Sequence, residues 1–159
     1  MKLVGFLLVG LALICLSASV RAQPKKQKIS ATLASETVAT QKVQSQYKGV
    51  HLGMTPQEVR AKLGDPAGKA QGLDYFVFSE TETATIAYNS GNQVVTISVD
   101  YQNGVGAPDY RTVVGEELLT RDDGSLYRLV RRPSEGFWVS YGRTAPGTVV
   151  IVSITIQKL

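Results

Sequence analysis

Cysteine is nearly absent from this sequence, since the only one, Cys15, lies in an apolar stretch close to the N-terminus. If that stretch is removed from the finished protein, the remaining chain has no cysteine. Disulfide bonds, thiolate nucleophiles and cysteine metal sites are then excluded together.

Residues and motifs for catalysis are equally scarce. His51 is the only histidine, with no second candidate ligand or nucleophile nearby, and it is read as a surface or edge residue. The chain lacks the motifs G-x-S-x-G and H-E-x-x-H, a phosphate-binding glycine loop and an EF-hand pattern. The acidic pairs are read as solvated surface or turn chemistry: Glu80 with Glu82, Glu116 with Glu117, and Asp122 with Asp123. We therefore expect no catalytic site, no metal site and no cofactor.

The N-terminal segment has the features of a signal peptide over residues 1–22. Lys2 precedes an apolar run over residues 3–16, and Val20 and Ala22 suit a signal peptidase, so we expect cleavage after Ala22. The protein is then periplasmic or secreted. An uncleaved membrane anchor is the alternative, although the run is shorter than the ~20 residues that span a bilayer. Lipidation of Cys15 is disfavoured by the bulky Ile14 before it.

Charge gives little support for a nucleic-acid partner. The formal net charge is +4, and loss of Lys2 and Arg21 with the signal peptide lowers it to +2. No concentrated basic stripe remains, so we expect no nucleic-acid binding.

Residues 23–47 are polar and predict a flexible leader. Its basic cluster is either a solvated tail or a weak contact with an anionic membrane surface, through Lys25, Lys26 and Lys28.

A short helix is framed by strong start and stop signals. Thr55 can cap the first turn, Pro56 suits the first helical position, and Glu58 completes a capping box with Thr55. Gly64 supplies a left-handed residue that ends the helix, and Pro66 forbids its continuation. About eight residues are too few for a helix that stands alone in water, so it must pack on something else.

Three strand signals follow this helix, over residues 75–78, 84–88 and 94–101. In the third, Val95, Ile97, Val99 and Tyr101 alternate with polar residues, which predicts a sheet with one buried face and one wet face. With 43% hydrophobic and 19% charged residues, the chain can form a packed core. We predict an α+β fold in which the short helix packs on a three-stranded antiparallel meander.

The second half repeats this pattern weakly. Arg60 and Gly64 align with Arg111 and Gly115, and an alternating strand over residues 149–157 matches the third strand of the first half. The spacing of a little over 50 residues is typical of a duplicated structural unit. We expect two tandem units, residues 48–103 and a divergent unit over residues 104–159.

A family resemblance rests on the residues around the first helix. The segment KGVHLGMTPQEV (residues 48–59), followed by LGDP (residues 63–66), resembles the SmpA/OmlA family, the BamE-like domain of outer-membrane assembly factors. The duplicated unit is similar to secreted β-lactamase inhibitor proteins. The resemblance implies a noncatalytic binding module of the cell envelope. Members of the assembly-factor branch carry a lipid-anchor cysteine directly after the signal peptide, where this chain has Ala22 and Gln23.

Aromatic and guanidinium groups gather in two strands expected in the second half. Such residues are enriched at protein interfaces, because they bury large areas and keep a polar handle. The candidate binding residues are Tyr127, Arg128, Arg131, Arg132, Trp138, Tyr141 and Arg143. Alternation places Phe137 and Tyr141 on one face and Trp138 on the other, and one of these faces must be core. The plainer interpretation is that one aromatic set fills the core while the arginines are solvated.

Three functions fit these residues. The first is a noncatalytic envelope or secreted module that binds a protein partner through the sheet face carrying the arginines and Trp138 or Tyr141. The second is an enzyme inhibitor that uses the concave face formed by both units, and the third is a structural or lipid-facing accessory held near a membrane by the leader.

Overall fold

The computed structural model describes residues 42–147 and 149–159, which belong to one compact unit of the chain. The expected signal peptide, its cleavage site near Ala22 and the basic cluster at Lys25, Lys26 and Lys28 lie outside the described residues. No helix within the described ranges is long and apolar enough to cross a membrane.

The end of the expected leader is packed against the fold, which corrects the boundary drawn from composition. Val43 and Tyr47 are buried, and the Gln44 amide donates a hydrogen bond to the Val113 carbonyl at 3.0 Å. Strand β1 (Gln46–Tyr47) then pairs with β2 (Val50–His51) in a small hairpin. The composition conceals this contact because the two apolar residues are separated by polar ones.

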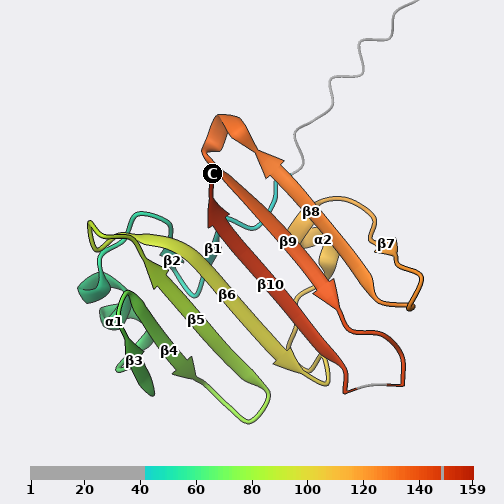
Figure 1. Ribbon diagram of the computed structural model, residues 1–159, viewed down its shortest axis with the longest axis horizontal. Coiled ribbons are helices and arrows are strands. Elements are labelled where there is room, and N and C mark those ends of the chain that lie inside the picture. Colours follow the sequence, from blue (N-terminus) through green and yellow to red (C-terminus); the bar gives the residue numbers. More distant parts are fainter. Residues whose placement is uncertain (1–41, 148) are drawn as a thin grey trace, which may run out of the picture. The chain divides into compact units, whose positions relative to one another are not determined.

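One large antiparallel sheet forms the body of the unit (Figure 1). Its strands are β3 (Gly68–Ala70), β4 (Leu73–Val77), β5 (Glu82–Tyr88), β6 (Val94–Gln102), β7 (Leu119–Thr120), β8 (Leu126–Arg132), β9 (Phe137–Arg143) and β10 (Ile151–Lys158). Their order in space is β3-β4-β5-β6-β10-β9-β8-β7. The mixed fold with a small helix and a large antiparallel sheet is therefore confirmed.

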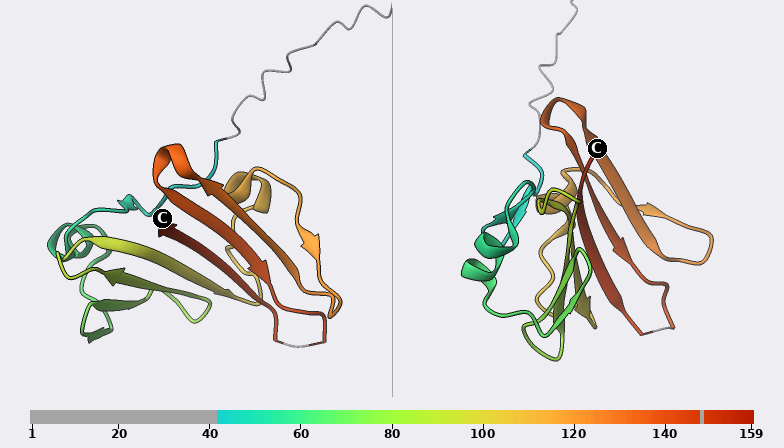
Figure 2. Two further views of the ribbon diagram at one scale, coloured as in Figure 1. Left: turned by 45° about the horizontal axis from the view of Figure 1, so that its top comes forward. Right: turned by 60° about the vertical axis from the view of Figure 1, so that its left-hand side comes forward.

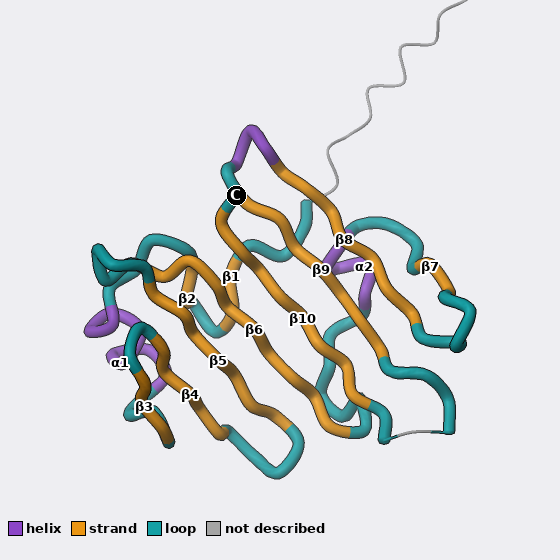
Figure 3. Tube along the Cα trace, viewed as in Figure 1, coloured by secondary structure: helices purple, strands orange, loops and turns teal. Residues whose placement is uncertain are grey.

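The two halves of the sheet meet along β6 and β10. Val99 lies opposite Ile154 and Tyr101 opposite Val152, so that both strands contribute apolar side chains to the same face. The sheet has eight strands, and β3 and β7 lie at its edges beyond the strands that the sequence predicts. Figure 3 shows how much of the described chain is strand.

The predicted caps define the first helix, α1 (Pro56–Leu63). Thr55 accepts a hydrogen bond from the Glu58 amide while the Glu58 carboxylate accepts one from the Thr55 amide, which is the predicted capping box. Gly64 ends the helix with φ 84° and ψ −168°, so its φ is positive as expected, but its ψ lies outside the left-handed helical region. The second helix, α2 (Tyr110–Val114), is capped by Asp109 and ends at Gly115 with φ 69° and ψ 4°.

Both helices and the β1-β2 hairpin lie on the same side of the sheet (Figure 2). We call this side the covered face; its strands bury an apolar layer that includes Phe76, Ile86, Ile97, Val139 and Ile154. Val59 of α1 and Val113 and Val114 of α2 complete the core. Because side chains alternate along a strand, the neighbouring residues project to the opposite side, the open face, which no described helix covers. A turn of 3₁₀ helix, η1 (Pro133–Glu135), links β8 to β9 at the sheet's end.

Candidate functional site

The seven candidate binding residues are divided between the two faces of the sheet. The register of β8 and β9 pairs Arg131 with Trp138 and Tyr127 with Gly142 on the open face. The covered face receives Arg128, Arg132, Tyr141 and Arg143. Trp138 and Tyr141 lie on opposite faces, as alternation along the strand predicts, and the arginines are divided as well, so no one face carries all of them.

Two of the covered-face members of this set, Tyr141 and Arg128, have structural contacts. Tyr141 is only 7% exposed, and its ring packs edge-on against Tyr110 of α2 with 6.2 Å between centroids. Arg128 forms an ion pair with Glu116 in the segment between α2 and β7. Arg143 is exposed at the end of β9. Tyr141 therefore belongs to the core, which answers the question of which aromatic set is buried.

On the open face, a group of apolar and cationic side chains extends over β7, β8 and β9. We call it the β7–β9 cluster; its members are Leu119, Tyr127, Leu129, Arg131 and Trp138. Leu119 lies opposite Tyr127 and is 58% exposed, and Arg131 is exposed opposite the half-buried Trp138. Directly opposite side chains in an antiparallel pair approach to about 5 Å, so these residues form one continuous surface.

A cavity extends this cluster toward the end of the sheet. It has a volume of ≈ 660 Å³ and is lined by residues of β8, β9, β10 and their loops, including Arg121, Tyr127, Gly142 and Ile151. The guanidinium of Arg121 lies 4.5 Å from the centroid of the Tyr127 ring, within cation–π distance. An apolar side chain of a partner therefore has a recess beside the cluster.

The middle of the open face is polar. Ser153 of β10 donates a hydrogen bond to Asp100 of β6 at 2.5 Å, and the hydroxyls of Ser98 and Thr155 lie 3.2 Å apart. These contacts cross the seam between the two halves. The paired hydroxyl and carboxylate groups satisfy part of one another's hydrogen-bonding capacity. The middle of the open face remains rich in short hydroxyl side chains, which suit hydrogen bonding to a partner.

A second exposed apolar area lies at the opposite end of the open face, and the sequence reading placed no candidate there. Tyr75 and Val77 of β4 are 39% and 53% exposed. Both alternate with buried residues, Asp74 and Phe76, but the sequence carries no signal for this exposure, because Tyr75, Phe76 and Val77 are all apolar and the polar Asp74 is on the buried side.

Two exposed acidic residues of the second half, Glu117 and Asp123, are engaged in local structure. Glu117 accepts hydrogen bonds from Tyr110 at 2.6 Å and from Arg111 at 2.7 Å, and both contacts lower the pKa of its carboxyl. Asp123 accepts a hydrogen bond from the Ser125 amide at 2.8 Å within a turn. No cluster of three or more metal-ligating side chains occurs within the described residues.

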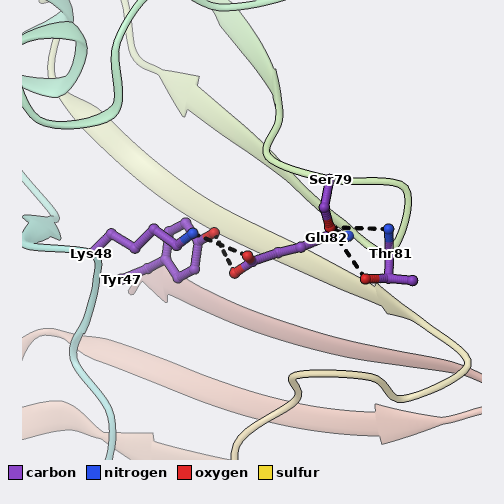
Figure 4. A network of polar contacts seen from close by, with 5 residues as sticks. All are labelled: Tyr47, Lys48, Ser79, Thr81 and Glu82. Carbon is purple, nitrogen blue, oxygen red and sulfur yellow. Dashed lines mark hydrogen bonds and ion pairs between the residues drawn. The ribbon is translucent and has the colours of Figure 1, made fainter.

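Glu82 holds the β1-β2 hairpin to the sheet (Figure 4). Its carboxylate accepts hydrogen bonds from the Tyr47 hydroxyl at 2.9 Å and from the Lys48 ammonium at 3.0 Å. The Lys48 nitrogen also lies 4.0 Å from the centroid of the Phe78 ring. Burial and the nearby Glu82 carboxylate raise the pKa of Tyr101 to about 12. This network attaches the β1-β2 hairpin to β5 and is therefore structural. The open face is the candidate binding surface.

Comparison with models of protein families, with curated proteins and with solved structures finds no match. The relation to the SmpA/OmlA family accordingly remains a proposal that rests on residues 48–66.

Proposed function

We propose that this chain is a noncatalytic, exported protein-binding module of the cell envelope, and that its partner binds the open face of the sheet. The β7–β9 cluster carries the proposal. It places a tryptophan, a tyrosine and an arginine together on a surface that no described helix covers, with Leu119 exposed beside them. This composition is that of the few residues that dominate binding energy at protein interfaces.

We also propose that the two halves arose by duplication of a BamE-like unit. The strand order supports this. In each half the strands follow chain order from an edge strand, β3 or β7, to a central strand, β6 or β10, and the two central strands pair with each other. Each half also begins with a short helix that ends at a glycine, Gly64 or Gly115. The SmpA/OmlA resemblance of residues 48–66 favours a periplasmic or secreted location.

An enzyme inhibitor is the second candidate function. It is favoured by the continuity of the open face across both halves, since Ser98 and Asp100 of β6 contact Thr155 and Ser153 of β10 there. A surface of that extent can cover the active site of an enzyme. A stoichiometric amount of an inhibitor abolishes the activity of the captured enzyme, whereas a scaffold leaves it unchanged.

The test of the proposal is a comparison of variants in affinity capture. The full-length chain is immobilised through a tag and exposed to cell-envelope extract, and the retained proteins are quantified by mass spectrometry. W138A is expected to weaken binding of the partner by about 30-fold, the effect of a 2 kcal/mol interface residue. Q57A, on the exposed side of α1, is the matched control and is expected to retain the partner.

Far-UV circular dichroism first establishes that both variants are folded. A protein that is retained by the wild type and Q57A and lost by W138A supports the open face as the binding surface. Equal capture by all three proteins would contradict it.

A further inference from the structure

Strand β8 has an edge that is only partly occupied. The neighbouring strand β7 is two residues long and pairs with Leu126 and Tyr127 alone. Beyond Tyr127, β8 continues to Arg132, and none of the described residues forms a backbone hydrogen bond with its outer edge there. An exposed strand edge with unpaired backbone groups is a template for pairing with another chain.

The hydrogen bonding of the neighbouring turn identifies which backbone groups face outward. The Arg132 carbonyl accepts a hydrogen bond from the Gly136 amide at 2.9 Å, within the β8–β9 connection. Polar groups of alternate residues in a strand point to the same side, so those of Arg132 and Val130 face β9. The amides and carbonyls of Leu129 and Arg131 therefore face the open edge.

The charge of β8 selects the kind of strand that fits there. Three of its seven residues are arginine, and one of them, Arg128, is already paired with Glu116. Arg131 is exposed, and its guanidinium has no hydrogen bond or ion pair with another described residue. Pairing β8 with β8 of a second copy would bring like charges within a cross-strand distance of about 5 Å, which is destabilising. The same argument makes the basic stretch over residues 25–28 of the chain's own N-terminal segment a poor match.

We propose that an extended, acidic segment of a protein partner adds to the sheet along β8 and pairs with the backbone of Leu129 and Arg131. This inference rests on the proposed protein-binding function and names how the partner is held. Strand addition obtains its affinity from main-chain hydrogen bonds and its specificity from alternate side chains. Apolar side chains of the added strand would lie beside Leu129 and Val130, and carboxylates beside the arginines.

The probe is a synthetic peptide with blocked ends that contains Glu-Glu-Val-Leu-Glu, the antiparallel complement of residues 128–132. The control peptides carry Lys in place of each Glu, or N-methyl groups on alternate amides. Binding to the full-length chain is measured by calorimetry. Hydrogen exchange followed by NMR reports the amides of Leu129 and Arg131, which are expected to exchange fast in the free chain and slowly in the complex.

A matched series at one position separates charge from backbone pairing. R131K is expected to bind the acidic peptide like the wild type, and R131Q about threefold more weakly because an exposed charge pair is lost. R131P is expected to bind about tenfold more weakly than R131Q, since proline removes the outward amide. Proline is tolerated at a solvent-facing edge position, and circular dichroism checks that R131P is folded.

Several outcomes would overturn the inference. Equal binding of the acidic, lysine and N-methylated peptides would exclude strand addition. Protection of the Leu129 and Arg131 amides in the free protein would mean that the edge is already occupied, by the N-terminal segment in a monomer or by a second copy in a dimer.

If the acidic peptide fails to bind while W138A still loses a captured partner, strand addition is wrong and the proposed function stands. If peptide binding follows the Arg131 series while W138A and Q57A capture partners equally, the edge is a binding site and the open-face proposal is wrong.

Discussion

Asp74 is the only charged residue that is buried among those the structure describes. Its carboxylate accepts hydrogen bonds from Arg60 at 2.8 Å and 2.9 Å and from the Tyr88 hydroxyl at 2.9 Å. A buried charge is tolerated only when its lone pairs are satisfied in this way. The three groups come from α1, β4 and β5, so the network fixes the first helix on the sheet.

Removal of the Asp74 charge is expected to destabilise the fold. D74N leaves the Arg60 guanidinium without its carboxylate and should lower the free energy of unfolding by about 2 kcal/mol. Y88F removes one hydrogen bond and should cost about 1 kcal/mol. Urea denaturation measures both; equal stability of D74N and the wild type would show that the network contributes nothing.

Buried tyrosines predict a loss of stability at high pH. Burial raises the pKa of Tyr47, Tyr88 and Tyr101, in the last case to about 12, above the ordinary value near 10. The folded state therefore holds protons that the unfolded state releases, so stability is full below pH 10 and falls as the pH rises toward 12. Ultraviolet titration should show tyrosines that ionise only as the protein unfolds. Ionisation of every tyrosine near pH 10 in a folded protein would contradict this.

At the scale of elements, the helix boundaries were predictable because capping is local chemistry. Thr55, Glu58 and Gly64 lie within ten residues of one another, and each acts on the backbone beside it. Strands β1, β2, β3 and β7 were not predicted in this form, since two or three residues carry no periodic pattern. Which face of β9 is buried was also not predictable, because both faces of the strand begin with an aromatic residue, Phe137 or Trp138.

The two helix-ending glycines are expected to respond differently to asparagine. Gly115 has the left-handed helical conformation that asparagine tolerates, so G115N should cost less than about 1 kcal/mol. Gly64 combines φ 84° with ψ −168°, a region used essentially by glycine alone, so G64N should cost about 2 kcal/mol. No atom lies within 4 Å of a side chain added at Gly64, so the cost is one of backbone conformation. Thermal or urea unfolding of both variants decides the order, and the reverse order would contradict it.

At the scale of the described unit, the β6–β10 seam joins both halves in one sheet and one core. Ile97 of β6 lies opposite Ile156 of β10, and both are 1% exposed. The sequence predicted both apolar strands and left open whether one sheet contains them. Pairing between strands so far apart in the sequence depends on the packing of the whole unit and is not visible in any local pattern.

This seam predicts that the two halves unfold together. I97A, in the first half, should lower the free energy of unfolding by about 3 kcal/mol through the cavity it creates. The only tryptophan, Trp138, lies in the second half, so its fluorescence reports that half alone. Fluorescence and circular dichroism should shift to the same lower urea midpoint. An unchanged fluorescence midpoint would mean that the halves are independent.

The open face as the partner's contact surface is the central claim, and site-specific photo-crosslinking in cells that produce the full-length chain tests it most directly. A photoreactive amino acid is placed at Thr155, at Trp138 or, as the control, at Gln57. Thr155 lies at the middle of the open face and Gln57 on the exposed side of α1. The account predicts a crosslinked partner at Thr155 and Trp138 and none at Gln57. A crosslinked partner at Gln57 alone would place the binding surface on the helix side and contradict the account.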